Sequence, residues 1–140
     1  MPALNPQIFY PMFAMFSLSL VALVVMFRRR TAAVKSGLVK VGQFKTYVQE
    51  SGPDKMIQAS RHFSNLFEAP ILFYVICILG MLFSEGTLFV ALAWLYVLAR
   101  SVHAYVHLGS NKLIPRMSSY GFGWLMLVAM WVLVLVHITL

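Results

Sequence analysis

Four apolar stretches, each long enough to cross a lipid bilayer as a helix, dominate this chain. A helical span needs about 20 mostly apolar residues and must satisfy its own backbone polar groups, because the hydrocarbon core contains no water. With 61% hydrophobic residues among 140, the composition excludes an ordinary soluble domain. The stretches run from about Ile8 to Phe27, Asn65 to Phe83, Thr87 to His107 and Ser118 to Thr139.

We therefore expect an all-α fold, an integral membrane four-helix bundle. It should form a single domain over residues 1–140, and the first stretch should be a retained helix because no basic segment precedes it. We expect the helices to extend beyond the apolar stretches, most of all the second, which should begin in the cytoplasm. The predicted helices cover residues 8–27, 54–83, 87–108 and 116–139.

The basic residues are concentrated between particular spans. Lys112 and Arg116 lie between the third and fourth spans, whereas the Ser84–Thr87 link carries no cation. The positive-inside rule predicts that both basic connections are cytoplasmic and that both termini are on the non-cytoplasmic side. Eight of the eleven Lys and Arg residues separate the first span from the second: Arg28, Arg29, Arg30, Lys35, Lys40, Lys45, Lys55 and Arg61.

The net charge of +7 favours membrane lipids as partners over nucleic acid, because the cations border the membrane and no groove-reading motif accompanies them. Within residues 28–55, Val34, Leu38, Val41 and Val48 recur at helical spacing with lysines between them. This pattern predicts an amphipathic helix on the membrane surface.

Two residues predict the shape of the second span. Asp54 follows a Ser-Gly-Pro turn signal, so we expect it to be the N-cap of a long helix. Pro70 should bend that helix near residues 66–70, since it removes one backbone hydrogen bond.

Polar side chains recur at helical spacing in three of the spans. Residues three or four positions apart share one face of a helix. Since Glu68 and Arg100 have similar depths in the inner leaflet, we expect them to pair. The three polar stripes are Arg61, Asn65 and Glu68 in the second helix, Arg100, His103 and His107 in the third, and Arg116 and Tyr120 in the fourth.

Three interpretations of these stripes remain open. The Glu68–Arg100 pair could be purely structural. The surplus of cations and donors around one buried acid instead suits a ligand with several carboxylates and one ammonium group. His103 and His107 could also hold a metal with Glu68, but the nearby Arg61 and Arg100 oppose a cation, and we assign no metal site. His62 and His137 are interpreted as surface or interfacial residues.

Two motifs resemble the MAPEG family, the membrane-associated proteins in eicosanoid and glutathione metabolism, in a bacterial-type form. The first, R-x-x-x-N-x-x-E-x-P, runs from Arg61 to Pro70. The second, R-x-x-H-x-x-x-H-L-G-x-N, runs from Arg100 to Asn111 and is followed by Arg116 and Tyr120. The likeness covers nearly the whole chain. For a bacterial protein, it would imply a location in the inner membrane.

The resemblance implies a homotrimer that binds glutathione as a co-substrate in a cleft between neighbouring protomers. It implies catalytic roles for Arg116 and Tyr120, with Arg116 stabilising the glutathione thiolate. The second substrate would be an apolar electrophile or lipid hydroperoxide, turned over by a transferase or peroxidase reaction. The glutathione-binding residues would come from the set Arg29, Arg61, Asn65, Glu68, Arg100, His103 and His107.

The sequence departs from the better-known enzymes of that family at three positions. Ser64 stands where a second arginine is common, His107 replaces a tyrosine, and Met117 replaces a serine of the prostaglandin-synthase branch. These differences favour an alternative function, a non-catalytic scaffold or accessory subunit of a larger membrane complex.

Overall fold

The computed structural model describes residues 4–45 and 51–140, and in these ranges it is helical and without strands. Four helical segments are long and apolar enough to cross a membrane, at Pro6–Lys35, Asp54–Leu82, Thr87–Leu108 and Leu113–Thr139. The all-α four-helix fold predicted from the sequence is therefore confirmed.

The four spans follow one another as antiparallel helices, and the second span consists of two helices. Two short 3-10 turns, Pro6–Ile8 and Val41–Phe44, accompany the long helices. The α-helices are α1 (Phe9–Lys35), α2 (Asp54–Asn65), α3 (Ala69–Leu82), α4 (Thr87–Leu108) and α5 (Leu113–Thr139).

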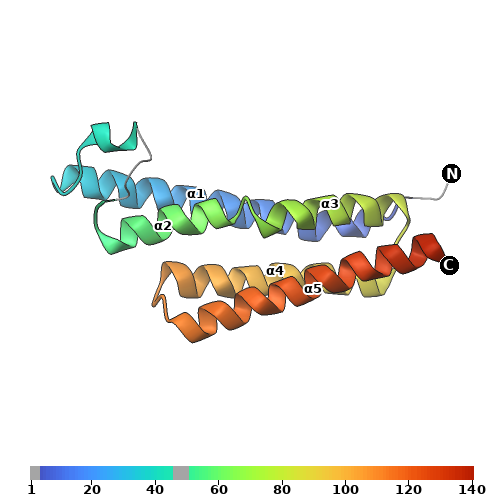
Figure 1. Cartoon of the computed structure of the whole chain (residues 1–140). Coiled ribbons are helices and arrows are strands. Elements are labelled where there is room, and N and C mark those ends of the chain that lie inside the picture. The colour runs from blue at the N-terminus through green and yellow to red at the C-terminus, as the bar shows by residue number, and fades with distance from the viewer. Residues whose placement is uncertain (1–3, 46–50) are drawn as a thin grey trace.

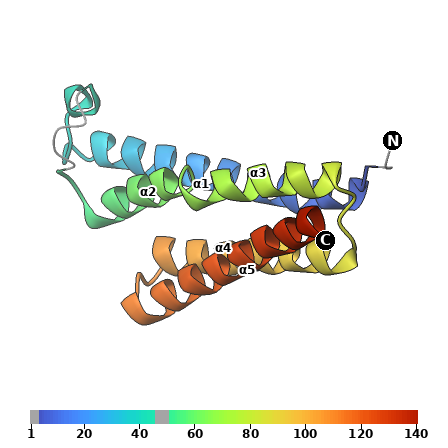
Figure 2. The same cartoon turned by 45° about the vertical axis from the view of Figure 1, so that its right-hand side comes forward.

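The helices form two layers. One contains α1 beside the nearly collinear α2 and α3, and the other contains α4 beside α5 (Figures 1 and 2). Helix α1 also contacts α4, while α5 packs against α3. The N-terminal and C-terminal ends of the described chain lie at the same end of the bundle (Figure 1), as an even number of spans requires.

The second span is interrupted between α2 and α3, where Pro70 was expected to bend it, but the two helices stay nearly collinear (Figure 1). Pro70 is in the first turn of α3, where its missing N–H is tolerated. Helix α2 ends at Asn65, and Leu66 and Phe67 continue in tight turns. Glu68 precedes α3 with non-helical backbone angles, φ −100° and ψ −101°. The break places Glu68 on irregular backbone and leaves Asn65 as the last residue of α2.

Two local predictions for the basic connection are wrong. Helix α1 continues to Lys35, so Val34 belongs to the first span, and Val41 begins a 3-10 turn rather than an amphipathic helix. Val48 lies outside the described residues. Pro53 occupies the N-cap position of α2, and Asp54 is its first helical residue without a side-chain cap.

Aromatic side chains pack closely from the middle of the bundle toward the termini. Phe73 and Tyr96 are fully buried, and their rings stack with centroids 4.4 Å apart. At Gly80 a Cβ atom would come within 2.5 Å of the ring of Phe89, which is also fully buried. The α3–α4 hairpin can therefore close only because residue 80 has no side chain.

Candidate functional site

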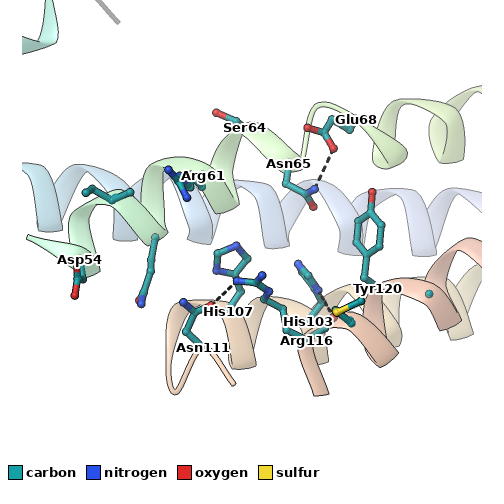
Figure 3. A pocket seen from close by; sticks show the side chains of 14 residues that line it. Asp54, Arg61, Ser64, Asn65, Glu68, His103, His107, Asn111, Arg116 and Tyr120 are labelled. Carbon is teal, nitrogen blue, oxygen red and sulfur yellow. Dashed lines mark hydrogen bonds between the residues drawn. The ribbon is translucent and has the colours of Figure 1, made fainter. Parts of the chain in front are cut away.

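A cavity of about 1020 Å³ lies between α2 and the α4–α5 pair (Figure 3). The α2 start and the α4–α5 turn, which contribute to its lining, lie at the end of the bundle away from the termini (Figure 1). Its volume is at the upper limit usual for small-molecule sites. The structure places seven of the nine predicted site residues in its lining: Arg61, Asn65, Glu68, His103, His107, Arg116 and Tyr120.

Asn65 connects the α2–α3 break to α4. Its Nδ2 donates to Oε2 of Glu68 at 3.1 Å, and its Oδ1 accepts from Nη2 of Arg100 at 2.6 Å (Figure 3 shows the first bond). Only this amide orientation serves both partners, because a guanidinium only donates and a carboxylate only accepts. The predicted direct pairing of Glu68 and Arg100 is therefore replaced by a relay through Asn65.

Arg100 lies behind the cavity wall rather than in its lining. It is 1% exposed, and its guanidinium carbon is 5.4 Å from the centre of the Tyr120 ring, a cation–π distance. The Asn65 oxygen and this ring provide its contacts at the cavity side. Arg100 thus fixes Asn65 and Tyr120 in position, while the Tyr120 hydroxyl points across the cavity toward the α2–α3 break (Figure 3).

Arg116 is fixed by two bonds at the turn between α4 and α5. Its Nη1 donates to Oδ1 of Asn111 at 2.8 Å, and its backbone oxygen contacts Nδ1 of His103 at 3.0 Å (Figure 3). Asn111 has a positive φ of 50°, a conformation that asparagine tolerates better than most residues. The turn therefore holds Arg116 at the cavity.

Arg29, the ninth predicted residue, lies outside this lining. Its Nη2 donates to the backbone oxygen of Leu108 at 2.6 Å, and its Nη1 donates to that of Lys55 at 3.0 Å. Leu108 is the last residue of α4, so the guanidinium satisfies a terminal carbonyl and complements the helix dipole. Within one chain Arg29 ties α1 to α2 and α4.

The charge of the cavity differs from the sequence-based expectation. Asp54, which was expected only as a cap, also lines the cavity as a second acid, at the opposite end of α2 from Glu68 (Figure 3). Glu68 itself is exposed in the single chain, not buried. The lining thus balances two acids against two guanidiniums, with Arg100 adding positive charge from behind.

His62 is not a surface residue, contrary to the sequence-based interpretation. It is fully buried, and its ring lies 5.8 Å from that of His103 and 5.3 Å from that of His107, between centroids. His62 follows Arg61 directly, so it lies about 100° around the helix from the Arg61–Asn65–Glu68 stripe, on the side of α4. This offset could have predicted from the sequence that His62 faces another helix. His137, in contrast, is half exposed and 3.3 Å from Glu85.

Comparison with known proteins gives one finding about family. The model of the MAPEG family matches residues 8–136, a range that includes all four candidate spans apart from their outermost residues. Searches of curated proteins and of solved structures give no match. With its four apolar helices, this chain is an integral multi-pass membrane protein that belongs to the MAPEG family.

Proposed function

We propose that this protein is a membrane-bound glutathione-dependent transferase or peroxidase that acts on an apolar electrophile or a lipid hydroperoxide. The observation that carries the proposal is one cavity that gathers Arg61 from α2, Glu68 from the α2–α3 break, and Arg116 and Tyr120 from α5. Membership of a family that includes such enzymes supports it.

The chemistry of glutathione suits this lining. The molecule carries two carboxylates, one ammonium group and one thiol. The cavity offers guanidiniums to bind the carboxylates, and carboxylate side chains to bind the ammonium group. Arg61 binds a carboxylate, Glu68 accepts hydrogen bonds from the ammonium group, and Asn65 holds Glu68 for that task. Asp54 offers a second acceptor at the open end of the α2 face.

Arg116 and Tyr120 act on sulfur. A free thiol has a pKa of about 8.5, so a guanidinium that stabilises the thiolate increases the reactive fraction at neutral pH. Tyr120 donates a hydrogen bond to the same sulfur. His103 acts indirectly, since its Nδ1 holds the Arg116 backbone.

In the transferase reaction the thiolate forms a bond to an electrophilic carbon, and the leaving group departs with its bonding electrons. In the peroxidase reaction the thiolate attacks the hydroperoxide, which releases an alcohol and leaves a sulfenic acid on glutathione. A second glutathione then forms the disulfide and releases water. Both reactions join a water-soluble thiol to a lipid-soluble partner.

The lipid-soluble partner enters from the bilayer, and the chain works as a homotrimer in the inner membrane of a bacterial cell. The exposed apolar face of α5, which includes Trp124 and Trp131, is available for helix contacts between protomers. Arg29 and Arg100 stay positioning residues in this proposal, because each is engaged inside its own chain.

The decisive variant is Arg116→Ala in the purified protein, assayed by conjugation of glutathione to a model aryl halide. We expect the rate to fall at least about 100-fold, as for loss of a preorganised charge-stabilising group. Arg28→Ala is the matched control, since Arg28 is exposed and outside the cavity. A variant with unchanged turnover would remove Arg116 from the mechanism.

A scaffold or accessory role predicts a different ligand response. A ligand specific for the folded state stabilises it by about 2.7 kcal/mol at 100 times its Kd. We expect glutathione at millimolar concentration to raise the Tm of the wild-type protein and to have a smaller effect on Glu68→Gln. No rise in Tm for the wild type would favour the scaffold.

A further inference from the structure

Three histidines from two helices meet beside the cavity. His62 comes from α2, and His103 and His107 come from α4. One ring nitrogen from each lies within 4.8 Å of those of the other two. His103 and His107 line the cavity, whereas His62 closes the group from behind.

Several nitrogens in this group have no hydrogen-bond partner. Among the residues that the structure describes, both ring nitrogens of the fully buried His62 are without one, as are Nε2 of His103 and Nδ1 of His107. A buried polar atom left unsatisfied costs about 1–3 kcal/mol. Ring stacking alone leaves this cost in place, because aromatic contacts satisfy no nitrogen lone pair. A ligand that accepts an electron pair from each ring would satisfy one nitrogen of each histidine and so remove most of this cost.

The hydrogen bond of His103 determines which nitrogen is available. Its Nδ1 lies 3.0 Å from the backbone oxygen of Arg116, and that oxygen can only accept, so Nδ1 carries the proton. In the neutral ring, Nε2 then presents a lone pair to the group. Histidines that bind metals commonly donate their other N–H to a carbonyl in this way, which fixes the tautomer and the ring orientation.

We propose that His62, His103 and His107 bind a divalent transition metal ion of the class that prefers imidazole, such as Zn²⁺. Three neutral nitrogen ligands leave a fourth position open, as in solvent-accessible zinc sites. Water from the cavity fills that position, because two of the three ligands line the cavity wall. Tetrahedral Zn–N bonds of about 2.1 Å place the nitrogens about 3.4 Å apart. Since the ring nitrogens lie within 4.8 Å of one another, binding requires each pair to approach by at most about 1.4 Å.

The surrounding charges limit the affinity without blocking the site. Arg100 is the nearest buried cation, and its guanidinium is engaged by Asn65 and Tyr120. Arg61 and Arg116 line the same cavity, with Asp54 and Glu68 opposing them. The two acids offset the two guanidiniums at the open side. The metal site needs no glutathione, so it stands or falls separately from the proposed enzymatic function.

The test uses the full-length protein in detergent, without a histidine tag, treated with a chelator and kept free of glutathione. Titration with Co²⁺ reports on coordination, since four-coordinate cobalt absorbs visible light strongly. We expect one ion per chain, displaced by Zn²⁺. His62→Phe keeps an aromatic ring in the stack and should weaken binding at least about 10-fold. The matched control is His137→Phe, which changes a histidine outside the group.

A second variant covers the case in which His62→Phe does not fold. His107 is only partly buried, so His107→Gln should assemble normally while losing one ligand, and it too should weaken Co²⁺ binding at least about 10-fold. Size-exclusion chromatography checks assembly. The proposal is overturned if wild type takes up no Co²⁺, if folded His62→Phe or His107→Gln binds as tightly as wild type, or if His137→Phe loses binding equally.

Discussion

The two ends of the bundle differ in how their helices meet. Toward the termini, Ile8, Phe89 and Met130 are fully buried in an apolar core, and Glu85 contacts Asn5 and His137 at its edge. At the other end, α2 and the α4–α5 pair leave a cavity of about 1020 Å³ with charged and polar walls. In lipid, association of helices depends on close packing because burial from water contributes little. The packed end therefore holds the bundle together and leaves the other end open for ligands.

The largest loss of stability is expected from a substitution in the packed end, at Phe89. Phe89→Ala should lower the free energy of unfolding by about 3 kcal/mol, the lower end of the usual range for Phe→Ala. The variant loses the packing contacts of the ring, but in lipid there is no added cost from the transfer of apolar surface out of water. Unfolding in detergent by added SDS, followed by circular dichroism, measures it. Leu88→Ala is the control, since Leu88 is 61% exposed. Equal effects at both positions would refute a packed core at this end.

The polar end should tolerate less change at Asn65 than its open cavity suggests. Asn65→Leu keeps the volume but removes the side-chain acceptor of Arg100 and the side-chain donor to Glu68, leaving Arg100 only the longer bond of 3.5 Å to the backbone oxygen of residue 65. We expect a loss of about 1.5–3 kcal/mol, the range for hydrogen bonds to charged groups. The same SDS titration applies, and Ser64→Ala should stay within about 0.5 kcal/mol of wild type. If Asn65→Leu were as stable as wild type, the two hydrogen bonds of Asn65 would contribute nothing to the free energy of unfolding.

One substitution made at both ends sharpens the contrast. Gly80→Ala should cost about 1–3 kcal/mol through overpacking, because its Cβ would meet the ring of Phe89 at 2.5 Å. Gly121→Ala, in the same titration, should instead stabilise by up to about 1 kcal/mol, since nothing lies within 4 Å of its Cβ and alanine favours the helix. The difference between the ends would be lost if both variants shifted stability in the same direction.

Sequence reasoning succeeded where local physics decides. The length and apolarity of the four stretches predicted the spans. Pro70 predicted where the second span departs from a regular helix, although as a bend rather than a break, because a proline acts on its own backbone. It failed for the basic connection, where the spacing of Val34 and Val41 looked helical although the chain leaves the helix after Lys35. There, hydrophobic spacing alone could not locate the end of a helix.

For the site, too, the sequence predicted local features but not how they come together. The stripes were visible in the sequence because spacings of three and four place side chains on one helix face. Which stripes meet was not visible, since this depends on the rotation of each helix against its neighbours. Asp54 in the cavity and His62 against His103 are the two residues that this rotation brought in.

By itself, the sequence determined that this chain forms four apolar helices and carries its polar groups at one end of three of them, because segment length and composition are local properties. The tertiary structure alone decided that Asn65 joins Arg100 to Glu68 and that three histidines converge. These contacts link residues up to 45 positions apart, from His62 to His107. Such contacts depend on how whole helices pack, and no spacing within one helix encodes that.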